Sequence, residues 1–278
     1  MSKIEWTDET WNPIRGCSRV SAGYENCYAE RMAIRMSGPG GAYEGVVIPT
    51  KKGPRWTGKI TVNWKAIEAP YKWKSPRMVF VNSMSDLFHP NVDRTAFKAI
   101  METMMYTESH TYQILTKRPE RIEWCMERSN LVNGFPSHMW IGTSVESNDV
   151  KKRIAHLITV DAKVRFLSVE PMLGPVDIDD YLDTGRIHWV IIGGESGPKA
   201  RFCSLDWKMS LVESCERYNV PVFVKQLGSH WGWDGSHVDS KYFSSSDYKT
   251  FDISFKGNDI SKWPAPLQKR EFPITQVA

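Results

Sequence analysis

Short β-rich runs alternate with helical patterns along most of the chain, and this alternation constrains the fold more than any other feature. Between the runs, apolar residues recur at helical spacing, as in Phe97–Met105, Val150–Ile158 and Trp207–Cys215. Such alternation is typical of βα units and a parallel sheet. The runs are Ile4–Thr7, Ile60–Asn63, Met78–Asn82, Tyr112–Thr116, Met139–Thr143, Arg165–Val169, His188–Ile192 and Pro221–Lys225.

Eight runs with helices between them predict the α/β class and a (β/α)8 TIM-type barrel. The first two runs are weak, so a six-stranded partial barrel is the alternative. The pattern stops near residue 229, where a stretch rich in Ser, Asp, Gly and Trp begins and includes Ser244–Ser246. We therefore expect an α/β barrel domain over residues 1–228 and, over 229–278, a C-terminal extension packed on the barrel. The Pro- and Gly-rich segment Ser37–Gly58 predicts a long loop.

The composition indicates a globular protein. Hydrophobic residues make up 41% and charged residues 24% of the 278 residues. We expect neither a signal peptide nor a membrane span, because the chain holds no run of about 18 apolar residues and its first residues lack an apolar segment. Five cysteines favour free thiols or metal ligands in a reducing cytoplasm over a disulfide framework. The formal charge of +4 permits an anionic or nucleic-acid partner without requiring one.

Polar side chains follow six of the runs, at the point where each predicted strand ends. In a parallel barrel these carboxyl ends open onto one face, and catalytic side chains come from several of them. Each residue alone also has a structural interpretation, such as a helix cap at Asp86 or a paired carboxylate at Glu146. The repetition across strands favours a functional face. The candidate catalytic residues are Asp86, Lys117, Arg118, Glu146, Glu170 and Lys225.

A second group of candidates follows the seventh run, in the segment GGESGPKARFC. Gly193 and Gly194 permit a close approach of the backbone to a ligand, and Glu195 suits an ammonium group or ribose hydroxyls. The chain has no GxGxxG and no P-loop motif, so a nucleotide would be held in another way. The candidate cofactor-binding residues are Gly193, Gly194, Glu195, Ser196 and Arg201.

The loop WNPIRGCSRVSAGYENCYAER carries Cys17 and Cys27 between the first run and a helix expected to start near Tyr28. Thiolates on such a loop suit iron–sulfur or zinc ligation, because backbone amides and a helix N-terminus stabilise negative charge. Taken alone, two cysteines with nine residues between them are a signal of low specificity that favours inert thiols over metal ligands. The loop is therefore a candidate metal site that lacks one ligand.

The chain contains, in this order, TWNPIRGC, NCYAER, VFVNSMSDLFH, ILTKRPER, WIGTSVES, RFLSVEPMLGP, WVIIGGESGPKAR and VFVKQLG. With these segments it resembles a family of phage and prophage proteins of unknown function that carry a three-cysteine motif and look like radical S-adenosylmethionine enzymes. The resemblance spans nearly the whole expected barrel. It implies a four-iron cluster (4Fe-4S) held by three thiolates, S-adenosylmethionine at the unligated iron, and a location in the cytoplasm of a bacterial host.

The family's motif is a Cys, six residues, a Cys, two residues and a Cys. Cys17 and Cys27 match its ends, but Tyr24 stands at the middle position. The resemblance therefore implies a phenolate ligand, a third ligand from elsewhere, or loss of the cluster with the barrel kept for binding. Cys125 and Cys215 fall in helical patterns and are expected in the core. The predicted metal ligands are Cys17, Cys27 and Cys203.

Two enzyme classes remain open at this point. The first is a radical S-adenosylmethionine-like iron–sulfur enzyme that acts on a nucleic-acid base or nucleotide. The second is a cluster-free barrel hydrolase or lyase, which would use a pair among Glu146, Glu170 and Glu195, or a metal at Asp86 and His89.

The third hypothesis is a non-catalytic nucleic-acid-binding barrel, with Trp56 and Trp231 as stacking platforms. Ordinary packing is the favoured interpretation of both tryptophans. The expected partners are thus a small-molecule cofactor and a nucleotide or nucleic acid, and we expect no association with a membrane. The sequence does not predict an oligomeric state.

Overall fold

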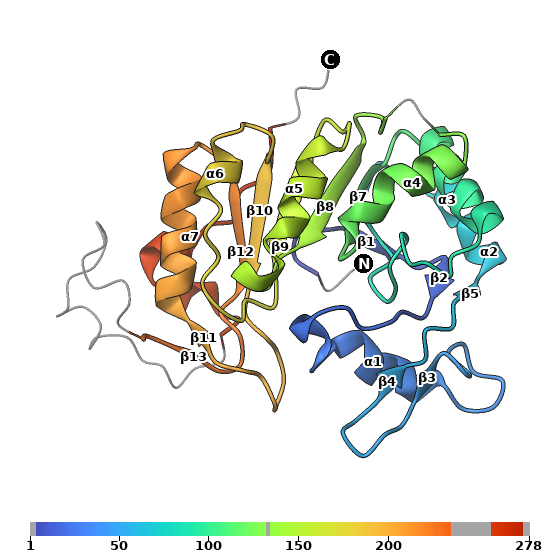
Figure 1. Ribbon diagram of the computed structural model, residues 1–278, viewed down its shortest axis with the longest axis horizontal. Helices are drawn as coiled ribbons and strands as arrows, with labels where there is room; N and C mark the ends of the chain where they lie inside the picture. Colours follow the sequence, from blue (N-terminus) through green and yellow to red (C-terminus); the bar gives the residue numbers. More distant parts are fainter. Residues whose placement is uncertain (1–3, 132–133, 235–256, 275–278) are drawn as a thin grey trace. The chain divides into compact units, whose positions relative to one another are not determined.

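The computed structural model describes residues 4–131, 134–234 and 257–274. Its contacts divide the chain into two compact units. The first unit comprises Met1–Thr143 and Thr159–Lys163, and the second comprises Ser144–Ile158 and Val164–Ala278. Both units are of the α/β class, and each is described by itself below (Figure 1).

Parallel strands form the centre of the first unit, in the order β1 (Glu9–Trp11), β6 (Met78–Val81), β7 (Thr111–Thr116) and β8 (Met139–Ser144). Helices α3 (Arg94–Tyr106) and α4 (Ile122–Arg128) follow β6 and β7. α3 begins where the side chain of Asp93 accepts hydrogen bonds from the backbone of Thr95 and Ala96, which caps the helix. Its buried stripe confirms the predicted helix: Phe97, Ile100, Met101 and Met104.

The remaining strands of the first unit are very short. β2 (Ile14–Arg15) pairs antiparallel with β5 (Thr61–Val62), and β3 (Val47–Ile48) pairs antiparallel with β4 (Arg55–Trp56). The second pair lies inside the predicted long loop, which is therefore partly ordered. Helices α1 (Tyr28–Ala33) and α2 (Trp64–Ile67) complete this part, and α1 begins where the sequence predicts a helix.

Three parallel strands form the second unit, in the order β9 (Arg165–Val169), β10 (Trp189–Gly193) and β12 (Val222–Gln226). Helices α5 (Lys152–Thr159), α6 (Asp179–Leu182) and α7 (Leu205–Arg217) accompany them, and α6 lies beside α7 (Figure 1). The short strands β11 (Cys203–Ser204) and β13 (Trp231–Gly232) pair in parallel. The single-turn 3-10 helices are η1 (Ala22–Tyr24), η2 (Ile34–Met36), η3 (Ala69–Lys72), η4 (Pro119–Arg121), η5 (Asn148–Val150), η7 (Ile260–Lys262) and η8 (Ala265–Leu267).

The expected closed eight-stranded barrel is wrong, whereas the α/β class is correct. The described residues contain seven such parallel strands, and β1 and β12 each have only one neighbouring strand there. At the outer edge of β12, the backbone carbonyl of Lys269 accepts a hydrogen bond from Val224, and the backbone N–H of Glu271 donates to Val222. The C-terminal residues thus cover a sheet edge of the second unit and block further strand pairing.

Two of the predicted runs are not strands of a parallel sheet. Ile4–Thr7 forms a turn, and the first strand is Glu9–Trp11, which ends before Pro13 because proline lacks a backbone donor. Ile60–Asn63 yields only β5, because the side chain of Asn63 already caps α2. The other six runs are confirmed.

The two compact units have other boundaries than residue 228, and the division predicted there stays a prediction. Ser244–Ser246 lie outside the described residues. In the described part of the chain, no helix has both the length and the apolar character that crossing a membrane requires.

Candidate functional site

The cysteine loop of the first unit is fixed to the strand β6 end by backbone contacts. Gly16 pairs with Ser85, and the Ser85 hydroxyl donates to the carbonyl of Ile14. Gly16 has a φ of +96° and lies so close to the carbonyl of Lys59 that a Cβ would sit 2.1 Å from it. Only glycine fits this position, so the loop conformation is encoded locally.

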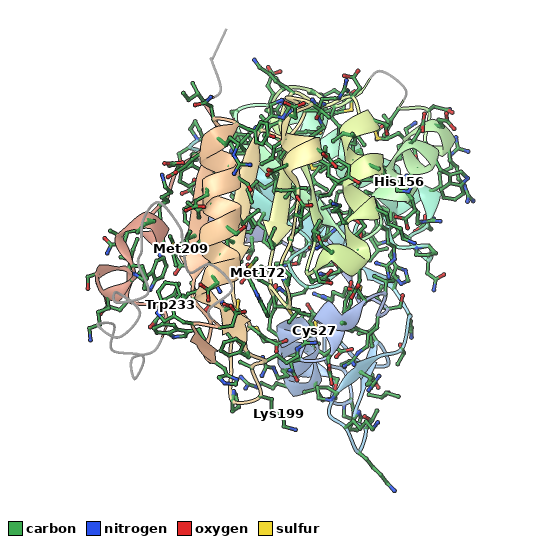
Figure 2. All side chains as sticks on the ribbon, turned by 60° about the vertical axis from the view of Figure 1, so that its left-hand side comes forward. Cys27, His156, Met172, Lys199, Met209 and Trp233 are labelled. Carbon is green, nitrogen blue, oxygen red and sulfur yellow. The ribbon has the colours of Figure 1, made fainter. Side chains whose placement is uncertain are left out.

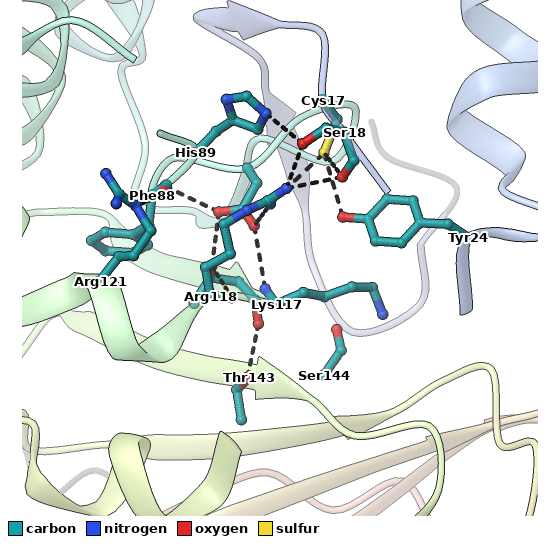
Figure 3. A network of polar contacts seen from close by, with 12 residues as sticks. Cys17, Ser18, Tyr24, Phe88, His89, Lys117, Arg118, Arg121, Thr143 and Ser144 are labelled. Atoms are coloured by element: carbon teal, nitrogen blue, oxygen red, sulfur yellow. Dashed lines mark hydrogen bonds and ion pairs between the residues drawn. The ribbon is translucent and has the colours of Figure 1, made fainter. Parts of the chain in front are cut away.

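Cys17 and Tyr24 are buried together in a small apolar cluster with Val46, Trp56 and Met84. The Sγ of Cys17 lies 3.4 Å from the hydroxyl oxygen of Tyr24 (Figure 3). Burial raises the pKa of the Cys17 thiol to about 11 and raises the pKa of the Tyr24 phenol well above its usual value. Both groups are therefore neutral near pH 7 and hydrogen-bonded to each other.

Asp86 and Arg118 form a buried ion pair at the ends of β6 and β7. Arg118 donates to Asp86 at 2.7 Å, and the side chains are each only 4% exposed. The carboxylate also accepts from the Thr116 hydroxyl at 2.8 Å. Arg118 further donates to the carbonyl and the hydroxyl of Ser18, at 2.9 and 3.0 Å (Figure 3). The guanidinium thus connects the cysteine loop to the strand ends.

Lys117, the neighbouring candidate, has two roles in this network. Its backbone N–H donates to Asp86 at 3.3 Å. Its ammonium group lies 5.5 Å from the centre of the Tyr24 ring, a cation–π arrangement. Lys117 therefore helps to hold Tyr24 in place.

His89 contacts Ser18, but the pair is not arranged as a nucleophile and its base. The backbone N–H of Asn91 donates to Nδ1 at 3.1 Å, so the neutral ring carries its proton on Nε2 and donates it to the Ser18 hydroxyl at 2.8 Å. Burial, helped by the charge of Arg118, lowers the pKa of His89 to about 4. His89 therefore cannot accept the Ser18 proton as a base, and both its nitrogens are engaged.

The donor set around the cysteine loop does not fit a cluster held by three thiolates. Cys27 is the residue preceding α1 (Figure 2) and packs against the cluster that contains Cys17, but the middle donor is the phenol of Tyr24, hydrogen-bonded to Cys17. Among the residues that the structure describes, no three His, Cys, Asp or Glu side chains come together as a metal site. Asp86 and His89 are occupied by protein hydrogen bonds, so the alternative metal at these residues has no support either.

Cys203, the proposed third ligand, lies in the second unit on β11. It is fully buried, and the ammonium nitrogen of Lys208 contacts its sulfur. Cys125 and Cys215 are buried on α4 and α7, as predicted. Trp56 and Trp231 are buried at 8% and 7% exposure, which confirms packing as their interpretation.

The second unit carries a separate polar network at the ends of β9, β10 and β12. Lys225 donates to Oε1 of Glu170 at 2.6 Å, and the side-chain amide of Gln226 donates to the same oxygen at 3.3 Å. The hydroxyl of Ser196 donates to the amide oxygen of Gln226 at 2.8 Å. Glu170 and Lys225 remain 19% and 21% exposed. This network is therefore within reach of solvent.

Two other predicted carboxylates are held by arginines. Glu146 pairs with Arg153 at 2.8 Å, and both side chains are buried. Glu195 accepts from the guanidinium of Arg201 through both of its oxygens, at 2.7 and 3.0 Å, and from the backbone N–H of Arg201 at 2.9 Å. These pairs fix the loops in which they lie, and they leave Glu170 as the most accessible of the three carboxylates.

Gly193 and Gly194 allow close approaches within the protein itself. A Cβ on Gly193 would lie 3.0 Å from the carboxyl carbon of Glu170, and a Cβ on Gly194 would lie 2.1 Å from the carbonyl of Leu227. The first glycine thus makes room for the carboxylate, and the second for the chain after β12. Contact of either glycine with a ligand stays a prediction.

Sequence reasoning missed Arg153 and Lys208, which contact Glu146 and Cys203. A signal for Lys208 was present, because it lies three residues after Leu205 and four before Val212, at the spacing of the buried stripe of α7. Arg153 has no such signal, since an arginine seven residues after a glutamate is an ordinary pattern.

Residues 1–260 match a family described as a protein of unknown function, DUF5131. The chain belongs to this family. The match covers the cysteine loop, both strand-end networks and the strands that carry them. No curated protein and no solved structure matches the chain. The DUF5131 membership agrees with the expected uncharacterised family and assigns no activity.

Proposed function

We propose that this DUF5131 chain is an enzyme of phage origin that resembles radical S-adenosylmethionine enzymes but lacks their three-thiolate cluster, and that it binds S-adenosylmethionine or a nucleotide at the strand ends of its second unit. The observation that carries the proposal is the partly exposed pair Glu170 and Lys225, joined to Gln226 and Ser196. Carboxyl ends of parallel strands are the usual ligand-binding edge of α/β proteins.

The hydrogen-bond donors and acceptors of the pair that have no partner among the described residues indicate the ligand. Within the described residues, Oε1 of Glu170 has hydrogen-bond partners, whereas none is present at Oε2. The ammonium of Lys225 uses one donor on Glu170 and has two more. A carboxylate oxygen suits a ribose hydroxyl or an ammonium group, and lysine donors suit a carboxylate or phosphate. S-adenosylmethionine and adenosine monophosphate both carry groups of these two kinds.

Independence from a cluster is supported by the cysteine loop. Arg118 and the Cys17–Tyr24 hydrogen bond hold this loop, so its shape needs no metal. If S-adenosylmethionine binds, Glu170, Lys225, Gln226 and Ser196 would hold it, and the cofactor would supply transferable groups on its sulfonium. The chain's own residues would orient it and screen its charges. A nucleotide or nucleic-acid base as the substrate remains part of the proposal.

Titration calorimetry tests the binding site. S-adenosylmethionine and adenosine monophosphate are titrated into metal-free protein, into Lys225→Met and into the control Lys151→Met, which removes a partly exposed lysine paired with Asp177. We expect saturable binding of one of the two probes by wild type and by the control, weakened about tenfold to a hundredfold in Lys225→Met by loss of a charged hydrogen bond. Absence of saturable binding of both probes, or equal weakening in both variants, would contradict the proposal.

Anaerobic reconstitution with iron and sulfide tests the cluster. Wild type should retain far less than one four-iron cluster per chain, and Tyr24→Cys, which supplies the missing thiol, should retain more. Cys17→Ala in the Tyr24→Cys background is the matched control and should lose it again. A full cluster in wild type would show that the phenol or another residue replaces the thiolate, and cluster independence would then be wrong.

A further inference from the structure

Cys203 and Lys208 form a buried contact that the proposed function does not use. Cys203 lies on β11 and Lys208 near the start of α7, and both side chains are fully buried. The Nζ of Lys208 lies 2.5 Å from the Sγ of Cys203. In the parts of the chain that the structure describes, this sulfur is the one hydrogen-bond partner of Nζ.

The surroundings of Lys208 make the contact unusual. The lysine stem occupies the apolar stripe of α7 together with Leu205 and Val212. The nearby carboxylate of Asp206 accepts from the Ser204 hydroxyl and from the backbone of Asp234. A buried polar nitrogen without a hydrogen-bond partner is costly, and the sulfur of Cys203 is the partner that the Lys208 nitrogen has.

We propose that Cys203 and Lys208 become covalently linked through a single oxygen atom when the protein is exposed to molecular oxygen. In this step, the Lys208 amine gives up one hydrogen, the Cys203 thiol gives up one, and both hydrogens leave in water. The O=O bond breaks, one oxygen atom bonds to Nζ and Sγ, and the other forms the water. Nitrogen and sulfur are each oxidised by two electrons, and dioxygen accepts all four.

Geometry and access both favour this product. The Nζ of Lys208 and the Sγ of Cys203 are in direct contact, so one bridging oxygen can reach both atoms without a movement of the backbone. Dioxygen is small and apolar, so it enters a closed interior that excludes charged or bulky reagents.

The link would join β11 to the start of α7 in the second unit. Ser204 lies between the two partners and caps α7 through the backbone N–H of Asp206. The loop from Ser196 to Arg201 leads directly into β11. The cross-link would therefore form beside a loop that contributes Ser196 to the proposed ligand site. Its formation does not depend on ligand binding at that site.

Peptide mass spectrometry after trypsin digestion tests the proposal. In reduced protein, cleavage after Arg201, Lys208 and Arg217 gives the separate peptides Phe202–Lys208 and Met209–Arg217. In air-exposed protein we expect a single peptide Phe202–Arg217, uncut at Lys208, with the mass of one oxygen gained and two hydrogens lost. Dithiothreitol should restore both peptides. Cys215 is an internal control, because it is equally buried on α7 but should stay unmodified.

Lys208→Met keeps a long apolar stem and should abolish the product, leaving Cys203 as an unlinked thiol; the wild-type peptide decides the matter even if this variant folds poorly. Release of Phe202–Lys208 to the same extent from air-exposed and reduced protein would overturn the proposal. So would oxygen added to Cys203 with normal cleavage at Lys208, or a loss of two hydrogens without an oxygen, which would indicate a direct sulfur–nitrogen bond.

Discussion

The strand-end networks of the two units use the same residue types with opposite accessibility. In the first unit, Asp86 and Arg118 are each 4% exposed, and their hydrogen bonds go to other groups of the protein. In the second unit, Glu170 and Lys225 are about a fifth exposed. Among the described residues, an oxygen of Glu170 and donors of Lys225 have no hydrogen-bond partner. The comparison teaches that position at a strand end does not by itself make a residue functional. Access to a ligand distinguishes a binding pair from a structural one.

Arg118→Met should be the most destabilising change. It leaves the buried carboxylate of Asp86 without its counter-charge and frees the cysteine loop at Ser18. Breaking a buried ion pair from one side costs about 3–5 kcal/mol. Urea unfolding measures the loss. The double variant Asp86→Leu with Arg118→Met should recover part of it, and a loss below about 1 kcal/mol in the single variant would show that the pair is not structural.

Acid should destabilise the first unit through His89. Its folded pKa is lowered to about 4 from an ordinary value of 6.5, so the unfolded chain binds more protons between these values. The stabilisation is present above about pH 6.5 and is lost as the pH falls toward about 4, at up to about 1.4 kcal/mol per pH unit. Denaturant midpoints measured from pH 7 to pH 4 test this. Burial also lowers the pKa values of His110 and His188, so His89→Gln is the control. If stability falls with pH as steeply in His89→Gln as in wild type, the role of His89 is refuted.

Tyr24→Phe should have a modest effect on the first unit. It removes the hydroxyl that contacts Cys17 and keeps the buried ring under Lys117. Loss of one buried hydrogen bond costs about 1 kcal/mol. Thermal unfolding at fixed pH measures the change, and a loss larger than that of Arg118→Met would mean that Tyr24, not Arg118, holds the loop.

Lys225→Met should have the smallest effect on stability and a clear effect on ligand binding. A partly exposed ion pair contributes about 0–1 kcal/mol. The variant should therefore unfold close to the wild-type midpoint while it loses affinity for the nucleotide probe. Destabilisation as large as that of Arg118→Met would remove the distinction between the two networks.

The sequence predicted the long elements well, since strands such as β9 and helices such as α3 carry enough residues to show their periodicity. It misplaced β1 and overextended β5, which have three and two residues and are limited by Pro13 and the cap at Asn63. Periodicity cannot mark such short strands. The closed barrel failed because the described sheet lacks an eighth strand and the C-terminal residues cover one edge.

The strand-end candidates were predicted as a set, but their pairing was not. Asp86 and Arg118 are 32 residues apart, and Glu170 and Lys225 are 55 apart. Partners at such separations are brought together by sheet order, which spacing in the sequence does not reveal. The two networks differ in solvent exposure. Exposure depends on the packing of whole loops, so the sequence does not predict it either.

The central claim is that the second unit binds its nucleotide without a cluster. Its most direct test is a calorimetric titration of S-adenosylmethionine and adenosine monophosphate into iron-free Cys17→Ala protein, beside the same protein carrying Lys225→Met. The account predicts saturable binding with wild-type affinity in the first and weakened binding in the second. Binding that appears only in wild type loaded with iron and sulfide, and is absent from iron-free Cys17→Ala, would contradict it.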